Sequence, residues 1–167
     1  MDCLLIATFT LIVGFGEEAP KGSPPDLSAA KSVDFNTAYR CDFVETLDQN
    51  YDNWPDYWLR HESPRYPLYV KAEIVPEPSP DSPRSLRVYL DGGSFAASSP
   101  KFPISSLSSY QIDLWVKTRN IINDRVWISY VILDSRDKPV ATFRSRPMGE
   151  TPQWTLLQLG PFEIEVP

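Results

Sequence analysis

Proline is the feature that most limits how this chain can fold. The 167-residue sequence holds 17 prolines and only 7 glycines, and a proline inside a helix removes a hydrogen bond and clashes with the preceding turn. From residue 33 onward, no proline-free stretch of helical length has the i, i+3, i+4 and i+7 spacing of apolar residues that marks an amphipathic helix. A helical domain is therefore excluded, and short strands joined by rigid loops are expected.

Strand-like segments recur along this part of the chain. They are Ala38–Glu45, Trp58–His61, Tyr69–Val75, Ser85–Leu90, Ser109–Lys117, Arg125–Leu133, Val140–Ser145 and Trp154–Leu159, with a short final segment at Phe162–Val166. Proline-rich or glycine-rich turn clusters separate them, as at Pro76–Pro83 and Asp91–Gly93. The pattern predicts an all-β domain, an antiparallel β-sandwich of the jelly-roll kind.

Charge and hydrophobic content narrow the class of function. Hydrophobic residues make up 42% of the chain, which is too much apolar surface for a disordered protein. Lys and Arg number 16 against 22 Asp and Glu, a formal net charge of −6. Because binding to nucleic acid draws most of its affinity from excess basic residues, no nucleic-acid partner is expected.

The N-terminal segment from Cys3 to Gly16 is apolar and uncharged, and it is shorter than the roughly 20 residues that span a bilayer as a helix. Small residues stand where signal peptidase would need them for cleavage ahead of Glu17. We interpret residues 1–16 as a signal peptide, or as a membrane anchor because no basic residue precedes the run. Residues 17–32 are expected to form a flexible Pro-rich linker and residues 33–167 the sandwich, which would be secreted or in the cell envelope.

Alternation along the strands predicts which side chains face inward. The apolar row is Leu86, Val88, Leu90, Ile112, Leu114 and Val116. The segment Arg125–Leu133 is apolar on both sides, as a central strand covered on both faces would be. If these three strands share one sheet, their other face carries flat aromatic rings, amides and charges. This predicted set is Arg87, Tyr89, Gln111, Asp113, Trp115, Lys117, Trp127 and Ser129.

Such a face has the chemistry of sugar binding. An aromatic ring offers a rigid plane for the apolar side of a pyranose, and neighbouring polar groups can bond its hydroxyls. We therefore predict that Arg87, Tyr89, Gln111, Asp113, Trp115 and Trp127 bind a ligand, a polysaccharide or an envelope glycan. The alternative is that the outward tryptophans merely cover their sheet. The aromatic loop Asp48–Pro67 has two interpretations as well. It forms the rim of a binding site, or its Trp54 and Trp58 fill one end of the sandwich.

Three short motifs support the binding interpretation. Asp42-Phe-Val-Glu45, then Asn53-Trp-Pro-Asp-Tyr-Trp58, then Tyr110-Gln-Ile-Asp-Leu-Trp-Val-Lys-Thr118 together resemble the galactose-binding-like jelly-roll carbohydrate-binding modules, in a form associated with large secreted or envelope proteins of planctomycete-type bacteria. The resemblance implies a sandwich strongly and a binding role weakly. Members of that family continue beyond the position of Pro167, so the final closing strands are expected to be lacking unless Phe162–Val166 supplies the last one.

A structural calcium ion is the one cofactor that the sequence suggests. Its candidate ligands are Glu45, Asp48 and Asp52, although the loop departs from the EF-hand pattern at Asn53 and Leu59. Carboxylates in such loops are also common turn formers.

Catalysis is not expected. His61 is the only histidine, no nucleophile elbow or zinc-ligand set is present, and only a glycosidase-type carboxylate pair stays formally open. The alternative function is a structural interaction or adhesion module of the envelope that contacts a protein partner through an exposed sheet edge.

Overall fold

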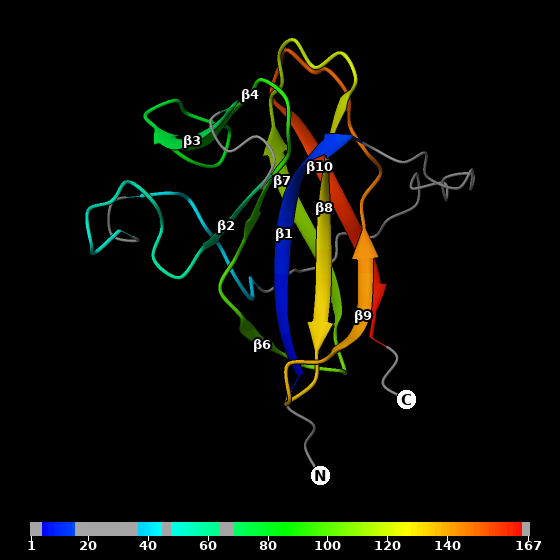
Figure 1. Ribbon diagram of the computed structural model, residues 1–167. Helices are drawn as coiled ribbons and strands as arrows, with labels where there is room; N and C mark the ends of the chain where they lie inside the picture. The colour runs from blue at the N-terminus through cyan, green and yellow to red at the C-terminus, as the bar shows by residue number, and fades with distance from the viewer. Residues whose placement is uncertain (1–4, 16–36, 45–47, 64–68, 165–167) are drawn as a thin grey trace.

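The computed structural model describes residues 5–15, 37–44, 48–63 and 69–164, and within these ranges the chain forms strands and no helix. Every strand pairing in it is antiparallel. The prediction of an all-β, antiparallel fold is therefore confirmed (Figure 1). Within the described part of the chain, no helix is long and apolar enough to cross a membrane.

The largest sheet has the strand order β2-β5-β1-β8-β9, and β6 pairs with β1 on the same side as β5. Its strands are β1 (Leu5–Phe15), β2 (Leu59–Glu62), β5 (Phe95–Ser98), β6 (Phe102–Ile104), β8 (Asp124–Leu133) and β9 (Pro139–Arg144). Figure 1 shows β1 and β8 running side by side through the middle of the molecule. Strands β2 and β9 end this order, and β6 is also an edge strand because it pairs with β1 alone in the described structure.

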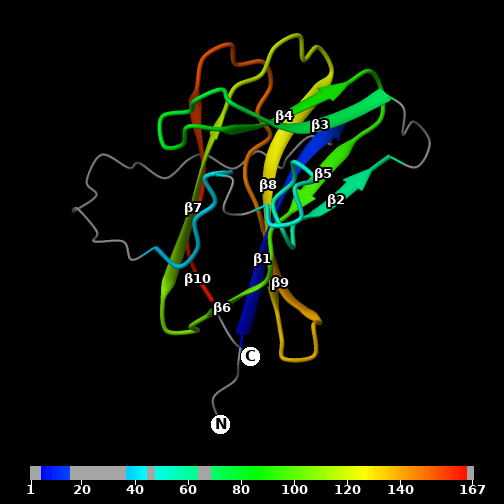
Figure 2. The same ribbon diagram turned by 90° about the vertical axis from the view of Figure 1, so that its left-hand side faces the viewer.

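Two further strand pairs stand apart from this sheet in hydrogen bonding. One is β3 (Val70–Val75) with β4 (Ser85–Leu90), and the other is β7 (Ser109–Val116) with β10 (Thr155–Glu163). Figure 2 shows both pairs beside the large sheet, with the β3–β4 connection reaching across to β7. The three strands that were expected to share one sheet, β4, β7 and β8, thus lie in three different hydrogen-bonded units.

The hydrophobic core has two parts, and each joins the large sheet to one strand pair. In the first, Ile128, Tyr130 and Ile132 of β8 pack with Val116 of β7 and Leu157 of β10. Strand β8 is buried on both faces, since Trp127 and Leu133 are buried as well, which confirms the prediction of a central strand covered on both faces.

The second part of the core joins β5 to the β3–β4 pair. Trp54, Trp58, Val70, Phe95 and Ala97 are buried there. Leu86, Val88 and Leu90 of β4 pack against it, as their alternation predicts. Trp54 and Trp58 therefore belong to the core, as in the interpretation that they fill one end of the sandwich.

The N-terminal apolar segment has a place in the sheet. Residues 5–15, expected to belong to a signal peptide or anchor, form β1, between β8 on one side and β5 and β6 on the other. An uncharged apolar run is also what a central strand requires, so composition alone does not separate the two uses. The predicted linker, residues 17–32, lies outside the described residues.

One predicted strand was wrong in its described part, and β5 and β6 were missed in addition to β1. Residues 37–44 are irregular, and the φ of 54° at Phe43 is incompatible with extended backbone at that position. Strands β5 and β6 went unseen because alanines weaken the strand signal of the first and Pro103 that of the second. Trp154–Leu159 and Phe162–Val166 join into the single strand β10 up to Glu163, with a register shift between Leu159 and Phe162.

Candidate functional site

The outer side of the β7–β10 pair carries the centre of the predicted ligand face. Ile112, Leu114 and Val116 of β7 pack into the core, so alternation places the residues between them on the opposite side. These outward residues are Gln111, Asp113 and Trp115 of β7, and Lys117 directly follows the strand. The three predicted residues within β7 thus share one face, as expected.

A row of polar side chains crosses this face. The Oδ1 atom of Asp113 accepts a hydrogen bond from Nε2 of Gln111 at 2.8 Å and another from Nε2 of Gln158 at 3.1 Å. Gln158 lies opposite Asp113 in the β7–β10 register, and the sequence prediction missed it. The sequence pattern that could have indicated Gln158 is the alternation of β10. That pattern becomes informative only once β10 is known to pair with β7.

Trp115 stands beside this row and is fixed in orientation. Its indole Nε1 donates a hydrogen bond to Oδ2 of Asp81 at 2.6 Å. Asp81 belongs to the β3–β4 connection, whose backbone is in turn held by Arg40, which donates to the Asp81 carbonyl oxygen at 2.9 Å. Trp115 is half-buried, so part of the residue is open to solvent.

Glu77, in the same connection, ties the two strand pairs together. Its carboxylate accepts a hydrogen bond from Arg87 of β4 at 2.6 Å and another from Lys117, which directly follows β7. Hydrogen bonds from Lys117 and Arg87 hold the pKa of the Glu77 carboxyl below its ordinary value. Arg87 also donates to the Tyr89 hydroxyl at 3.3 Å. Lys117 Nζ lies 5.1 Å from the ring centre of Trp154, a cation–π distance.

These contacts define one surface, called here the outer face. It consists of Glu77, Asp81, Arg87, Tyr89, Gln111, Asp113, Trp115, Lys117, Trp154 and Gln158. The structure thus brings together five of the six predicted ligand-binding residues. The side chains of Glu77 and Asp81 make this connection. Sheet hydrogen bonds do not make it, because β4 and β7 belong to different sheets.

Trp127 is not part of the outer face. It lies on β8 in the large sheet, only 7% exposed, and the Arg144 guanidinium covers its ring at 4.1 Å. The physical reason is the central place of β8, because a strand covered on both faces buries both sets of its side chains. Ser129 lies on the same strand, where it pairs with Thr10 and Arg144.

The proposed calcium ligands act as turn formers where they are described. The two carboxylate oxygens of Asp48 accept the backbone N–H groups of Asp52 at 3.1 Å and Asn53 at 2.9 Å, and Asp52 accepts that of Trp54 at 2.8 Å. Glu45 lies outside the described residues. Within the described ranges, no group of three or more His, Cys, Asp or Glu residues is placed to hold a metal ion. Calcium binding stays a prediction.

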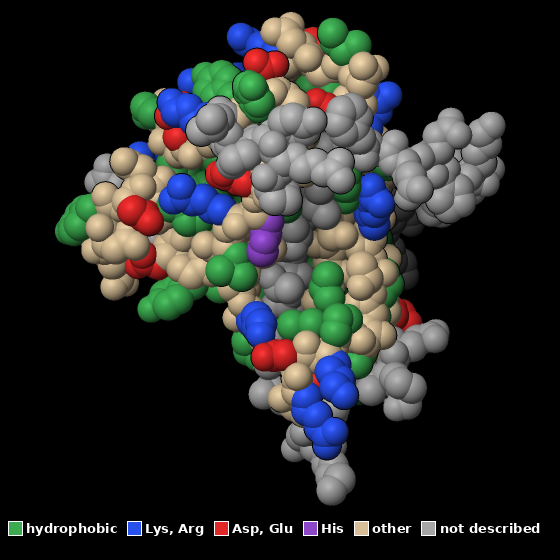
Figure 3. Space-filling view, in the orientation of Figure 1, with side chains coloured by type: hydrophobic (Ala, Val, Ile, Leu, Met, Phe, Trp, Pro, Cys, Tyr) green, Lys and Arg blue, Asp and Glu red, His purple; other side chains and the backbone are tan. Residues whose placement is uncertain are grey.

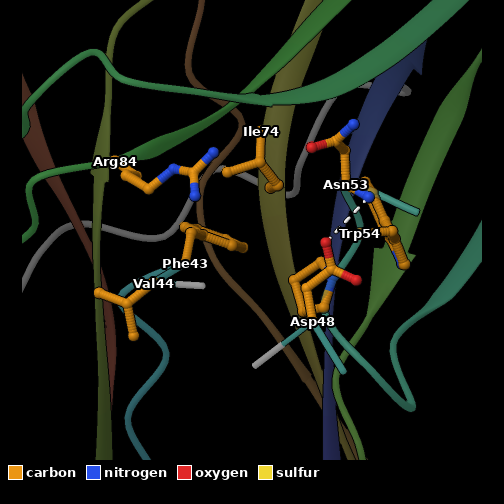
Figure 4. Close-up of a pocket in the computed structure, with 8 residues that line it drawn as sticks. Phe43, Val44, Asp48, Asn53, Trp54, Ile74 and Arg84 are labelled. Carbon is orange, nitrogen blue, oxygen red and sulfur yellow. Dashed lines mark hydrogen bonds between the residues drawn. The ribbon is translucent and has the colours of Figure 1, made fainter. Parts of the chain in front are cut away.

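A small hollow lies next to this loop, between Trp54, Asp48 and Phe43 on one side and Ile74 and Arg84 on the other (Figure 4). Its volume is about 10 Å³, close to the minimum for one water molecule, so a sugar ring does not fit. A wider surface hollow of about 340 Å³ lies at the end of the β3–β4 pair and is lined in part by Tyr89 of the outer face.

The single histidine is placed as a surface residue. His61 is exposed on the edge strand β2 and is seen in purple in Figure 3. Cys41 is half-buried, and burial raises the pKa of its thiol to about 11, so the thiol stays protonated at neutral pH. Neither arrangement offers an activated nucleophile or base. The non-enzymatic interpretation stays a prediction.

Comparisons of this chain with models of protein families, with curated proteins and with solved structures found no match.

Proposed function

We propose that this protein is a non-catalytic module that binds polysaccharide on its outer face, with the ring of Trp115 as the stacking platform. One observation carries the proposal. Of the five tryptophans, Trp54, Trp58 and Trp127 are buried at 5%, 8% and 7% exposure. The two that are not buried, Trp115 and Trp154, both belong to the β7–β10 side of the outer face.

The groups around these rings supply the second half of a sugar site. A pyranose needs a flat apolar surface for its C–H side and donors and acceptors for its hydroxyls. Asp113 offers carboxylate acceptors, and the amides of Gln111 and Gln158 offer both kinds of group. All three are solvent-accessible and already oriented by their mutual hydrogen bonds.

The contacts behind the face favour binding because they fix its geometry in advance. The Trp115 indole is oriented by Asp81, and Lys117 is held by Glu77. A site that is ordered before binding loses less conformational entropy when the ligand arrives. Tyr89, Asp113 and Gln158 of the outer face are exposed, and an exposed face suits a chain-like ligand better than a single small molecule.

The finer fold assignment belongs to the same proposal. We infer a sandwich of the galactose-binding-like jelly-roll kind, supported by the two core parts between the large sheet and the strand pairs. By the same resemblance, we place the binding role in the secreted or envelope compartment. An experimentally determined structure tests the first inference, and fractionation of cells that produce the full chain tests the second.

A titration of the full chain tests the binding role. Soluble β-glucans, xylans, mannans and galactans are added with and without calcium while tryptophan fluorescence is recorded. One glycan class should give a saturable change, and Trp115→Ala should weaken its binding about tenfold or more. Tyr57→Ala is the matched control, because Tyr57 is an exposed aromatic residue away from the outer face, and it should leave binding unchanged.

The alternative is a structural interaction module that binds a protein partner and no sugar. The observation in its favour is that apolar side chains such as Leu107 and Ile122 are 96% and 83% exposed, and that β2 and β9 leave two sheet edges in the described structure. Folded protein that responds to no glycan in the titration would refute the sugar-binding proposal and support this alternative.

A further inference from the structure

Strand β1 holds the large sheet together. It pairs with β8 from Ile6↔Leu133 to Phe15↔Asp124, with β5 from Thr10↔Ser98 to Val13↔Phe95, and with β6 from Leu5↔Ile104 to Ala7↔Phe102. The described strands on one side of it are β2, β5 and β6, and those on the other are β8 and β9. No pairing in the described structure joins these two sides except through β1.

Removal of β1 would therefore divide the sheet. The β2–β5 pair would separate from the β8–β9 pair, and β6 would lose the only partner strand that the described structure gives it. Backbone N–H and C=O groups along β5, β6 and β8 would lose their hydrogen bonds to β1. Such groups cost free energy when they are left unpaired inside a protein.

The strands on both sides of β1 belong to the core. On β5, Phe95 and Ala97 are 1% and 0% exposed, and on β8, Ile128 and Ile132 are 1% and 0% exposed. A gap between these strands would open both parts of the core to water at once. Loss of this strand should thus prevent the domain from folding stably, and the effect should exceed that of trimming a terminus.

We propose that residues 5–15 are an integral strand that stays in the folded protein, and that the slot between β8 and β5–β6 is a binding surface for this one apolar strand of the same chain. Cleavage ahead of Glu17 would remove that strand. The segment therefore acts as a structural element and is not a discarded leader. This inference does not rest on the proposed sugar binding, because none of its residues belongs to the outer face.

A paired-cysteine experiment on the full chain tests the slot, its register and its occupant. The variant carries Thr10→Cys and Ser129→Cys, which replace register partners, with Cys3 and Cys41 changed to Ala. Opposite residues on antiparallel strands have Cα atoms about 4.5–5.5 Å apart, within the range that a disulfide bridges. Oxidation should give a disulfide-bonded monomer that peptide mapping assigns to positions 10 and 129.

The off-register control is Thr10→Cys with Arg125→Cys. Arg125 lies opposite Gly14, four residues and about 13 Å along the strand from Ser129, and this variant should stay reduced. A disulfide-bonded dimer of the first variant would overturn the proposal by showing that the slot is filled by a second copy. Folded protein that forms no disulfide in the first variant would overturn it as well.

Hydrogen exchange on the unsubstituted full chain keeps the proposal testable if the cysteine variants do not fold. The amides of residues 5–15 should exchange at least about 100-fold more slowly than in an unfolded peptide. Exchange at the unfolded rate in otherwise protected protein would contradict an integral strand. Intact mass gives a further check, because folded protein recovered from producing cells with its first residue at Glu17 would also contradict it.

Discussion

The buried hydroxyl of Tyr130 allows a stabilising substitution to be predicted. Tyr130 is 1% exposed, its ring packs 5.1 Å from that of Phe162, and its Oη atom has no hydrogen-bond partner in the described structure. A buried hydroxyl without a partner costs about 1–3 kcal/mol. Tyr130→Phe removes the hydroxyl and keeps the ring. It should raise the free energy of unfolding by about 1 kcal/mol, or the melting temperature by about 2–4 °C.

Tyr110→Phe is the matched control for this substitution. The Tyr110 hydroxyl is within hydrogen-bond distance of both backbone groups of Ser105, with 2.6 Å to its nitrogen and 3.0 Å to its carbonyl oxygen. Loss of these bonds should lower the free energy of unfolding by about 1 kcal/mol. Urea unfolding of the full chain, followed by tryptophan fluorescence at neutral pH, gives both values on one scale.

The pH dependence of stability above pH 10 gives a second test of the Tyr130 hydroxyl. Burial raises the pKa of Tyr130 above its ordinary value of 10.0. The free energy of unfolding is therefore unaffected by titration of this hydroxyl below about pH 10. It falls as the pH rises further, because the unfolded chain releases the proton first. The increase in the free energy of unfolding that Tyr130→Phe gives over the parent chain should therefore be largest above pH 10. If it destabilises the protein by 1 kcal/mol or more at neutral pH, the hydroxyl has a partner and the reasoning is refuted.

Two further predictions concern the backbone at the register shift in β10 and the charges behind the outer face. Gly160 has a φ of +109°, and a Cβ there would lie 2.6 Å from the Tyr110 carbonyl oxygen, so Gly160→Ala should cost about 3 kcal/mol or more. Gly92→Ala should cost about 1 kcal/mol, since its φ is +86° but nothing lies within 4 Å; equal costs in urea unfolding would contradict the steric argument. The lowered pKa of Glu77 means that its stabilisation is present above its ordinary pKa of 4.5 and is lost as the pH falls through the lowered value. Glu77→Gln should therefore flatten the fall in unfolding free energy below pH 4.5 and cost less than about 1 kcal/mol at pH 7; an unchanged acid profile would show that the carboxyl is not paired in solution.

Period-two alternation predicted the inward faces of β4 and β7 and most of the strands, but not β1, β5 and β6. Leu114 and Trp115 are on opposite sides of β7 as expected, because a pleated strand leaves no other choice once one face is buried. The same reasoning failed for Trp127. Its outward parity was right, but the second face of β8 is covered as well, and parity does not tell which strand becomes central.

The parts that sequence could not supply depend on contacts between distant segments. Gln158 joins the face only through the pairing of β10 with β7. Glu77 and Asp81 join it because the β3–β4 connection reaches β7, 40 and 34 residues further along the chain. The N-terminal run was interpreted by its composition, and an export segment and a central strand share that composition.

The most direct test of the proposed binding face is a two-dimensional ¹⁵N–¹H spectrum of the full chain, because each tryptophan gives its own indole Nε1–H signal. The signals are assigned by single Trp→Phe substitutions, and the glycan that binds best in the titration is then added. Binding at the outer face should shift the signals of Trp115 and Trp154 and leave those of Trp54, Trp58 and Trp127 in place. Saturable binding that moves only the buried tryptophans, or none of the five, would contradict the assignment of this face.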